Sequence, residues 1–330
     1  MKYWLTRRWY GSAPAPWFLR PLAALFGLVA RLRRARLQAK AQLNRLPAPV
    51  IVVGNIAVGG TGKTPFVIWL VERLREWGWR PGVVSRGYGG SARSWPQRVG
   101  ADSDPALVGD EPVLIATHAA CPVVVGPDRL AAGMALLNGG GVDIVISDDG
   151  LQHYRLWRDL EIAVVDASRG LGNGRLLPAG PLREPASRLG EVGLVVANGS
   201  GWSAPAGKQV TMRLRATEAR ALGGSETRPI ASFSGTTVHA VAGIGNPARF
   251  FSMLSQHNIQ LVMHPFPDHH PFTRADLDFG DALPVLMTEK DAVKCRAFAG
   301  PGQWVVPVVA TFEAEDVARV QELTRALKTA

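Results

Sequence analysis

The feature that most constrains how this chain can fold is a glycine-rich loop placed directly after a run of apolar residues. Residues 50–53 read Val-Ile-Val-Val, and residues 57–64 read Ala-Val-Gly-Gly-Thr-Gly-Lys-Thr. The pattern over Phe66–Trp77 then predicts an amphipathic helix. A buried strand, a glycine-rich turn and a helix in this order are typical of a parallel α/β unit.

The composition of this loop is typical of a phosphate-binding site. Its glycines let backbone N–H groups close around an anion, Lys63 can reach the terminal phosphates, and the Thr64 hydroxyl can ligate Mg²⁺. The positive end of the following helix would face the same anion. The consensus has Gly where this chain has Ala57, and a glycine-rich turn with an incidental Lys-Thr pair is the alternative. The order of strand, loop and helix favours a nucleoside triphosphate site formed by Gly59, Gly60, Thr61, Gly62, Lys63 and Thr64.

Beyond residue 46, apolar strand-like runs alternate with helical stretches, which predicts a parallel sheet with covering helices. We therefore predict an α/β fold with a P-loop NTPase-like sheet, a smaller second α/β domain and an N-terminal membrane-associating helix. In the second domain, a strand is expected over 304–309 and a final helix over 315–327. The expected segments are the N-terminal segment over 1–45, a P-loop domain over 46–205, a linker ribbon over 206–232 and the smaller domain over 233–330.

The net charge of +10 belongs to the N-terminal segment. Residues 1–50 hold ten Lys and Arg and no Asp or Glu, whereas residues 51–330 hold 27 residues of each sign. Because the globular part is formally neutral, we expect no nucleic-acid partner. The two cysteines, Cys121 and Cys295, give no disulfide framework and no metal-site spacing, which indicates a reducing compartment.

The same N-terminal segment contains an apolar stretch over Pro21–Ala30, with several aromatic residues before it. This stretch is too short to cross about 30 Å of hydrocarbon, which needs roughly 20 residues. Arginines over Arg31–Arg36 stand where a signal peptide would have its cleavage site. The combination is typical of a helix that lies in the interface of a membrane with anionic headgroups. A basic helix that packs on its own domain is the alternative.

Two adjacent carboxylates, Asp148 and Asp149, follow the apolar strand expected over 142–147. The carboxyl ends of parallel strands are where α/β sheets bind ligands, and P-loop proteins use an acidic residue there to help hold Mg²⁺. A role in capping a turn explains one of the two carboxylates but not both. Gln152 and His153 follow at once, and for His153 a structural role is as compatible with the pattern as a functional one.

A third acidic position introduces a helix in the sequence Gly109-Asp110-Glu111-Pro112. Asp110 could cap this helix, with Glu111 in its first turn. It could equally act as a general base, because kinases position a carboxylate to accept the proton of the substrate hydroxyl. The local pattern leaves both interpretations open.

Three further segments carry polar side chains. Ser85–Gly90 forms a flexible loop after a strand, and its Arg86 and Tyr88 suit contacts with a substrate phosphate or sugar. His264–His270 is expected to be a loop, and its histidines lack the spacing of a zinc site. The charges of Thr288–Lys294 indicate either a solvated helix start or contacts across a cleft.

Together, these segments resemble the tetraacyldisaccharide 4'-kinases of the lipid A pathway. The resemblance covers about residues 50–295, and the N-terminal segment resembles the membrane-associating helix of that family. The loop of this family is itself atypical, so Ala57 is no departure from it. The matching segments are Val53–Pro65, Ser85–Gly89, Gly109–Pro112, Asp148–His153, Leu176–Glu184, Phe266–His269 and Thr288–Lys294.

The resemblance implies a Mg²⁺-dependent transfer of the γ-phosphoryl group of ATP to the 4'-hydroxyl of a tetraacyldisaccharide 1-phosphate. Residues 46–205 would be the kinase domain, and residues 233–330 would close the cleft. The partners would be the lipid A disaccharide precursor and the anionic surface of the bacterial inner membrane, on its cytoplasmic face. No obligate protein partner is expected.

The resemblance also implies roles for individual residues. Asp110 would be the base, assisted by His269, although the neighbouring His270 leaves the register open. Lys63 would hold phosphate, and Asp149 would serve the reacting centre. The metal would be held by Thr64, Asp148, Asp149 and Glu111, and the substrate side would be lined by Arg86, Tyr88, Gln152 and His153.

A membrane-associated switch ATPase with a deviant Walker A loop is the main alternative. Gly59–Thr64 fits the spacing of such a loop. However, these proteins carry a signature Lys just before the paired glycines, where this chain has Val58.

Overall fold

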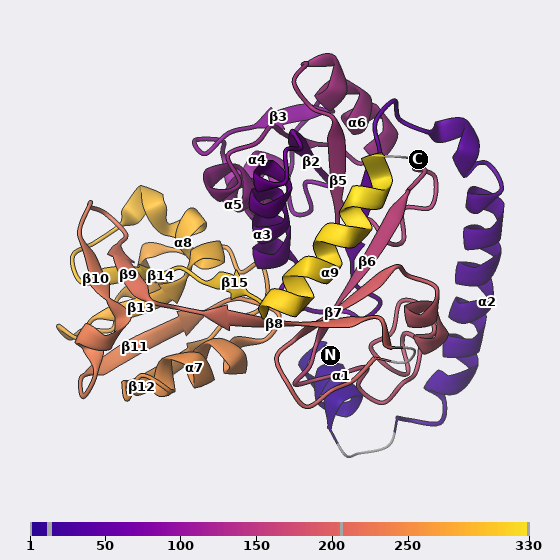
Figure 1. The fold of residues 1–330 in the computed structure, drawn as a ribbon. Helices are drawn as coiled ribbons and strands as arrows, with labels where there is room; N and C mark the ends of the chain where they lie inside the picture. The colour runs from indigo at the N-terminus through magenta and orange to yellow at the C-terminus, as the bar shows by residue number, and fades with distance from the viewer. Residues whose placement is uncertain (1, 12–14, 205–206, 329–330) are drawn as a thin grey trace.

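The computed structural model describes residues 2–11, 15–204 and 207–328, which form two lobes built on separate sheets (Figure 1). We call the larger sheet with its helices the large lobe. Its strands are β1 (Val50–Gly54), β2 (Pro81–Ser85), β3 (Gln97–Val99), β4 (Val123–Val125), β5 (Ile144–Asp148), β6 (Leu160–Asp166), β7 (Leu194–Asn198), β8 (Gln209–Arg215) and β15 (Val309–Thr311). Its helices are α3 (Lys63–Glu76), α4 (Pro105–Val108), α5 (Asp110–His118), α6 (Arg129–Asn138) and α9 (Ala314–Arg325).

The second sheet and its helices form the small lobe. Its strands are β9 (Glu218–Ala221), β10 (Thr227–Pro229), β11 (Thr237–Ala242), β12 (Gln260–Pro265), β13 (Val285–Thr288) and β14 (Gln303–Val306). Its helices are α7 (Pro247–Ser255) and α8 (Glu289–Cys295). In the described part of the chain, the strand order is β15-β8-β7-β6-β1-β5-β2-β4-β3 in the large sheet and β10-β9-β14-β13-β11-β12 in the small one.

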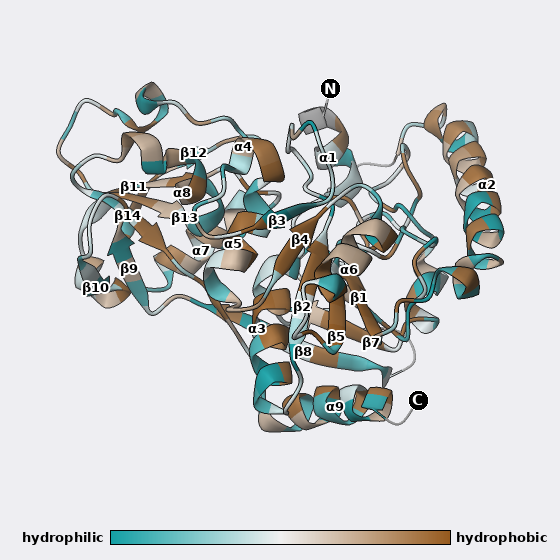
Figure 2. Ribbon diagram, turned by 90° about the horizontal axis from the view of Figure 1, so that it is seen from above, coloured by the Kyte–Doolittle hydropathy of each residue, from teal (hydrophilic) through white to brown (hydrophobic). Residues whose placement is uncertain are grey.

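Strand β1 lies at the centre of the large sheet, between β5 and β6 and parallel to both. Its residues are fully buried and alternate between two cores, as the pleat of a strand requires. Ile51 and Val53 pack in the core that α3, α5 and α9 cover, whereas Val50 and Val52 pack in the core that α6 covers. Figure 2 shows the central strands as an apolar layer. The structure is therefore mixed α/β with parallel strands, as the sequence predicts.

The chain crosses back to the large lobe near its end. The strand expected over 304–309 is two strands, because β14 stays in the small sheet while β15 pairs antiparallel with β8. Pro307, between them, cannot donate a ladder hydrogen bond. Helix α9 then packs Val317 and Val320 on the large-lobe core. The segment expected over 233–330 thus contributes to both lobes.

Residues within the expected linker ribbon form strands of both sheets, of which β10 is an edge strand. β8 extends the large sheet beside β7, and β9 and β10 extend the small sheet. Residues 205, 206, 329 and 330, at the ends of the expected segments, lie outside the described residues. So do Met1 and residues 12–14 of the expected N-terminal segment.

The N-terminal segment forms two helices, α1 (Lys2–Tyr10) and α2 (Leu19–Gln38), rather than one. Helix α2 lies along the side of the large lobe, away from the small lobe (Figure 1). Its small residues face inward, since Ala23 is buried and a Cβ on Gly27 would lie 2.6 Å from the Leu176 side chain. No helix within the described ranges combines the length and hydrophobicity that crossing a membrane needs.

Candidate active site

The glycine-rich loop joins β1 to α3, and the helix begins at Lys63 rather than at the expected Phe66. Gly62 precedes the helix with a φ of 93°, in the left-handed region that favours glycine. A Cβ on Gly62 would also lie 2.3 Å from Asn198 Nδ2. The Asn198 amide uses this close approach to donate to the carbonyl of Thr61 at 3.0 Å. The loop is thus folded with its Lys and Thr in the first turn of a helix.

A second segment of the chain supports the outer side of this loop. The Val58 N–H donates to the carbonyl of Pro181 at 2.8 Å, and the Arg183 N–H donates to the carbonyl of Ile56 at 2.7 Å. Ala57 forms an antiparallel bridge with Leu182. The motif Leu176–Glu184, far away in the sequence, therefore lies directly against the loop.

Asp148 ends β5 and is completely buried. Its Oδ2 accepts a hydrogen bond from Ser85 Oγ at 3.0 Å, but its Oδ1 has no hydrogen-bond partner among the described residues. Burial, together with the nearby charges of Glu111 and Asp149, raises the pKa of the Asp148 carboxyl. This carboxylate lacks the partner that a buried charge requires.

Asp149 follows with a φ of 48°, a strained backbone conformation for a residue other than glycine. Its Oδ1 lies 3.4 Å from Lys63 Nζ, and its Oδ2 lies 3.6 Å from Arg183 Nη1. Burial opposes its ionisation, but the two cations outweigh burial and lower the pKa of Asp149 to about 2. Burial likewise disfavours the charged form of Lys63, yet Asp149 and Glu111 raise its pKa overall. Both groups are charged at neutral pH.

Asp110 is the first residue of α5 and faces the small lobe. Its Oδ1 accepts from the N–H of Glu111 at 2.9 Å, and its Oδ2 lies 3.1 Å from Nδ1 of His269. Burial raises the pKa of Asp110, but the hydrogen bond from His269 and the charge of Lys290 reverse this effect and lower it. The same hydrogen bond outweighs burial at His269 and raises its pKa. The structure therefore places His269 beside Asp110, whereas His270 contacts Asp276 within the small lobe.

Lys290, in the first turn of α8, joins the two lobes at the same place. Its Nζ lies 2.9 Å from Glu111 Oε1, 3.2 Å from Asp268 Oδ1 and 3.4 Å from His269 Nε2. Burial disfavours the charged form of Lys290, but the surrounding carboxylates raise its pKa strongly. The charges of Thr288–Lys294 thus make a contact across the cleft.

The residues expected on the substrate side lie on two segments of the large lobe, the loop after β2 and the turn after β5. Tyr88 is 61% exposed, and its ring centroid lies 5.1 Å from that of His269. Arg86 is exposed on the same loop. Gln152 Nε2 donates to Glu184 Oε1 at 2.6 Å, and its Oε1 accepts from Arg183 at 3.4 Å.

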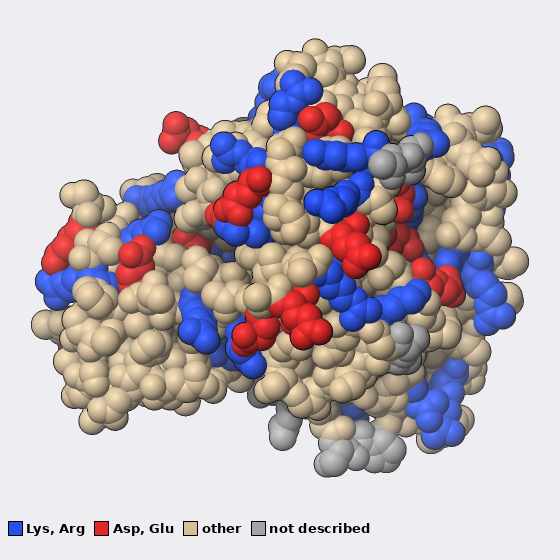
Figure 3. All heavy atoms as spheres, in the orientation of Figure 1, with Lys and Arg blue, Asp and Glu red and all other residues tan. Residues whose placement is uncertain are grey.

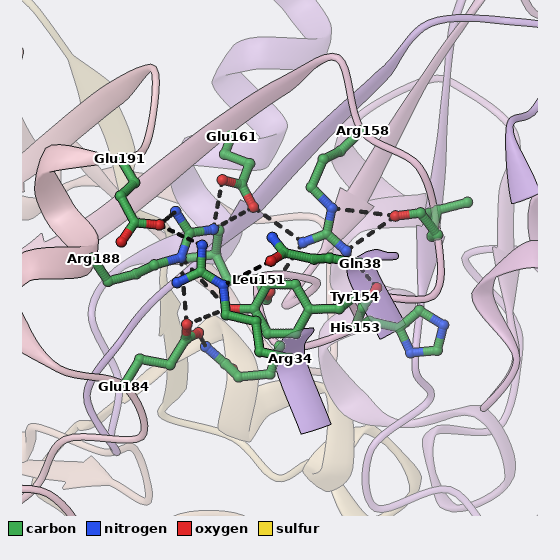
Figure 4. A network of polar contacts seen from close by, with 12 residues as sticks. Arg34, Gln38, Leu151, His153, Tyr154, Arg158, Glu161, Glu184, Arg188 and Glu191 are labelled. Atoms are coloured by element: carbon green, nitrogen blue, oxygen red, sulfur yellow. Dashed lines mark hydrogen bonds and ion pairs between the residues drawn. The ribbon is translucent and has the colours of Figure 1, made fainter. Parts of the chain in front are cut away.

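His153 is partly buried near Arg129 and Arg158. Burial and the nearby charges of Arg129 and Arg158 lower the pKa of His153 to about 4, so its ring is neutral at physiological pH. Figure 4 shows the imidazole pointing away from the Glu184 and Arg188 side chains. Its Nε2 is buried with no hydrogen-bond partner in the described part of the chain.

A cavity of about 620 Å³ opens between the lobes beside the loop. The large lobe lines it with residues 60–65, Glu111 and Asn198, and the small lobe lines it with residues of α7 and with Thr288–Lys290. Its walls include apolar side chains from both lobes: Ile68, Leu114, Leu214, Ile244, Met253, Val306 and Val308. A cavity of this size that combines apolar walls with polar and charged side chains is typical of a small-molecule site.

The carboxylates beside the loop suit a divalent cation that is shared with phosphate groups. Within the described ranges, no group of three or more His, Cys, Asp or Glu is arranged to hold a metal alone. Mg²⁺ is usually held by one or two carboxylates together with substrate phosphates. The unpartnered Oδ1 of Asp148 and the hydroxyl of Thr64 at the start of α3 fit this mode.

Four residues that the structure places at this site were not predicted from the sequence: Arg183, Glu184, Asp268 and Lys290. All four lie in motifs that the sequence singles out, Leu176–Glu184, Phe266–His269 and Thr288–Lys294. Nothing local to those motifs indicates that they meet the glycine-rich loop and Glu111, because the contacts join positions that are distant in the sequence.

The large lobe combines a parallel sheet with a glycine-rich strand–loop–helix turn at its carboxyl edge, and carboxylates lie beside that turn. This combination defines an α/β protein with the architecture of phosphate-binding enzymes. The model of the family described as Tetraacyldisaccharide-1-P 4'-kinase matches residues 15–327. The chain belongs to this family.

Individual relatives agree with this assignment. A tetraacyldisaccharide 4'-kinase of Nitrosococcus oceani is 51% identical over 320 residues, which cover 97% of this chain and 94% of that protein. One of Alkalilimnicola ehrlichii is 55% identical over 312 residues, which cover 93% and 91% of the two chains. The crystal structure of LpxK from Aquifex aeolicus in complex with ATP is similar with a TM-score of 0.75 and 28% identity, over 94% of this chain and 98% of that one.

Proposed function

We propose that the protein transfers the γ-phosphoryl group of ATP to the 4'-hydroxyl of a tetraacyldisaccharide 1-phosphate, a step of lipid A biosynthesis. The observation that carries this proposal is the Asp110–His269 pair, which joins both lobes next to Glu111, a residue that lines the same cavity as Lys63 and its loop. Membership of the tetraacyldisaccharide-1-P 4'-kinase family supports the choice of acceptor. The ATP of the similar crystal structure supports the choice of donor.

The glycine-rich loop binds the phosphates of ATP in this proposal. Backbone N–H groups of Gly59–Gly62 and the positive end of α3 surround them, and Lys63 contacts the terminal groups. Thr64, Asp148, Asp149 and Glu111 would hold Mg²⁺, which would neutralise charge on the phosphates. The nucleoside occupies the apolar cavity between the lobes.

Asp110 acts as the general base. Its lowered pKa keeps it ionised at neutral pH, so that it can accept the proton of the 4'-hydroxyl. The 4'-oxygen then forms a bond to the γ-phosphorus, the bond from that phosphorus to the β–γ bridging oxygen breaks, and ADP leaves. His269 donates from Nδ1 to Asp110 and fixes the direction of the carboxylate.

In this proposal, the acceptor contacts the loop of Arg86 and Tyr88 and the turn of Gln152 and His153. Tyr88 packs beside His269 and is exposed, so it is placed to contact the sugar. We propose that the small lobe closes on the large lobe around the nucleotide, which excludes water and limits hydrolysis of ATP.

We propose that α2 holds the protein on the cytoplasmic face of the inner membrane. Leu22, Leu25, Val29 and Leu32 lie on one face at helical spacing and are 52–62% exposed. This is the reverse of an ordinary surface helix, which buries its large apolar residues. A groove beside this face is lined by cations, including Arg33, Arg36 and Lys40. Figure 3 shows mainly uncharged surface over α2, with Lys and Arg among it.

Sedimentation with vesicles tests the membrane proposal. Replacing Leu25 and Leu32 by Asn should weaken binding, whereas Met263→Asn, at an equally exposed position of the small lobe, should not. Replacing Arg33, Arg36 and Lys40 by Gln should lower the affinity for anionic vesicles more than ten-fold, at about 1 kcal/mol for each charge. Binding that is unchanged in both sets of variants contradicts the proposal.

Incubation with labelled ATP and the lipid A precursor tests the kinase proposal. Wild-type protein should produce 4'-phosphorylated lipid, and Lys63→Ala and Asp110→Ala should each lower the rate by at least about 100-fold. Asp143→Ala, which removes an exposed carboxylate paired with Arg80, is the matched control. Absence of product with wild-type protein contradicts the function, and unchanged rates in both variants contradict the site.

A further inference from the structure

A loop of the small lobe lies directly against the glycine-rich loop of the large lobe. This second loop, residues 243–246, joins β11 to α7. A Cβ on Gly245 would lie 2.1 Å from the backbone N of Gly60, and a Cβ on Gly60 would lie 3.4 Å from Gly245 Cα. Gly245 does not have the positive φ that by itself demands glycine. The contact therefore needs glycine at position 245 because the two backbones touch.

Polar contacts around Asp166, at the end of β6, tie the two loops together. Asp166 is 3% exposed, and both of its oxygens are used by residues of the small lobe. Asn246 Nδ2 donates to Oδ2 at 2.8 Å, and Arg249 Nη2 lies 3.0 Å from Oδ1. From the large lobe, Arg169 Nη1 donates to the carbonyl of Gly245 at 2.7 Å.

The same residues reach the glycine-rich loop from two sides. Arg249 donates to the carbonyl of Asn198, whose side chain donates to the carbonyl of Thr61 at 3.0 Å. On the other side, the Arg169 guanidinium lies 5.0 Å from the centroid of the Tyr10 ring, and the Tyr10 hydroxyl donates to the carbonyl of Val58 at 2.9 Å. The loop is thus held between α1 and the small lobe.

The physical consequence follows from burial and from the flexibility of glycine. A carboxylate as buried as Asp166 needs partners. Separation of the lobes would remove Asn246 and Arg249 from it, so that its Oδ2 would lose its hydrogen bond while its Oδ1 would keep those from Ser168. A loop with glycines at positions 59, 60 and 62 has many conformations available, so external contacts must select one of them. A loop that is already in its binding conformation loses less entropy when it captures phosphate.

We propose that Gly245, Asn246 and Arg249 are positioning residues that hold the glycine-rich loop in its nucleotide-binding conformation. The small lobe then determines nucleotide affinity through the loop, in addition to any contact it makes with the nucleotide. This inference rests on the proposed use of ATP. None of these three residues belongs to the family-like motifs that the sequence indicates.

Gly245→Ala is the sharpest test, because the added methyl group must push the Gly60 backbone away. We expect about ten-fold or greater weakening of binding for a non-hydrolysable ATP analogue, measured by calorimetry. The KM for ATP should rise by a similar factor, while the KM for the lipid acceptor and the melting temperature without nucleotide stay close to wild type. Gly224→Ala is the matched control, since its Cβ would meet only Ala221 at 3.8 Å in the same lobe.

Two substitutions of Arg249 test the proposal if Gly245→Ala does not fold. Arg249→Met should weaken binding of the analogue, and Arg249→Lys, which keeps a charge near Asp166, should restore part of it. Arg220→Met, which removes an Arg paired with Glu218 on the small-lobe surface, should leave binding unchanged. The inference is overturned if Gly245→Ala binds the ATP analogue as tightly as wild type does. If Gly245→Ala is unfolded, wild-type affinity for the analogue in Arg249→Met overturns it. If wild-type protein itself does not bind the analogue, the proposed function fails instead.

Discussion

Two groups of buried charge in the large lobe are built on opposite principles. Around Arg188, which is 1% exposed, the charges have close partners: both oxygens of Glu161 lie 2.5 Å from its Nη2, and Glu184 lies 3.4 Å from its Nε (Figure 4). Beside the glycine-rich loop, the charges are under-partnered. Asp148 Oδ1 has no hydrogen bond among the described residues, and Asp149 keeps a positive φ with cations at 3.4 and 3.6 Å.

The difference separates a scaffold from a binding site. A buried ion pair with close contacts keeps its geometry whether or not a ligand is present. Carboxylates that lack partners gain them when a cation and phosphates arrive, so their cost in stability is recovered on binding. Glu184 belongs to the first group and contacts Gln152 at the edge of the second, so the scaffold directly adjoins the site.

Arg188→Met should show the largest effect on stability. Removal of the guanidinium leaves Glu184 without its ion pair and Glu161 with Arg158 alone, which should cost about 3–5 kcal/mol of unfolding free energy. Denaturant titration at neutral pH measures this loss. Adding Glu184→Gln should recover part of it, since the carboxylate that has lost its ion pair is then neutral. An Arg188→Met protein as stable as wild type would show that this group is not the scaffold that its geometry indicates.

Much of the architecture around these groups could be predicted from local patterns. The apolar runs of β1 and β5 and the glycine loop between β1 and α3 are read from consecutive residues, and the structure has them close to the expected positions. The division of 304–309 between two sheets could not be predicted. β15 forms its hydrogen bonds with β8, which lies almost a hundred residues earlier in the chain. Pro307 was a visible signal for a break, but not for the destination of the following strand.

The site shows the same limit. Lys63, Thr64 and the carboxylates at positions 148 and 149 belong to two short motifs, so the sequence could indicate them. Arg183 and Lys290 lie elsewhere in the sequence. Only the fold brings Arg183 close to Asp149 and Lys290 close to Glu111. The sequence could also not distinguish His269 from His270; the backbone of His269, with a φ of 63°, turns its ring toward Asp110.

Asp148→Asn should affect activity and stability in opposite directions. The kcat should fall about 100- to 1,000-fold, because a neutral amide is a weaker ligand than a carboxylate for a divalent cation. Without Mg²⁺ and nucleotide, the variant should be more stable than wild type at pH 8. The folded-state pKa of Asp148 is raised, so folding favours its protonated form and its contribution to stability is lost as pH rises through that value.

Thermal unfolding at pH 5 and pH 8 checks the stability half of this prediction. The gain over wild type should be larger at the higher pH, where wild-type Asp148 must ionise. Asp143→Asn, which alters an exposed carboxylate just before β5, should change neither kcat nor the pH dependence. A variant that loses stability as well as activity would place Asp148 with the scaffold instead.

The Asp110–His269 contact is intermediate between the closely paired Arg188 group and the under-partnered carboxylates beside the glycine-rich loop. Its contribution to the stability of the protein should depend on pH. The raised pKa of His269 means that its contribution to stability is complete below about pH 6.5, its unfolded value, and declines as pH rises through the folded value. The lowered pKa of Asp110 gives a contribution that is present above about pH 3.9 and is lost as pH falls through the folded value. The pair should therefore stabilise the protein most between these limits.

His269→Gln tests this pH dependence. We expect a loss of about 0.5–1.5 kcal/mol near pH 6, the usual worth of a hydrogen bond, and a smaller loss at pH 8.5. Unfolding free energies of the variant and of wild type at the two pH values give the comparison. His257→Gln, at the end of α7, serves as the control. A loss that does not vary with pH would indicate that the His269 ring acts by packing alone.

The smallest effect is expected where the Arg188 group reaches the surface. Arg34 of α2 contacts Glu191 there, but Glu191 is 48% exposed, and Glu191→Gln should cost no more than about 1 kcal/mol. High salt should remove even this difference, because exposed pairs are screened. The charges at the centre and at the rim of the group are of the same kind and differ chiefly in burial. A loss at Glu191 as large as that of Arg188→Met, measured by the same denaturant titration, would mean that ionic contact rather than the packing of Ala23 and Gly27 attaches α2 to the lobe.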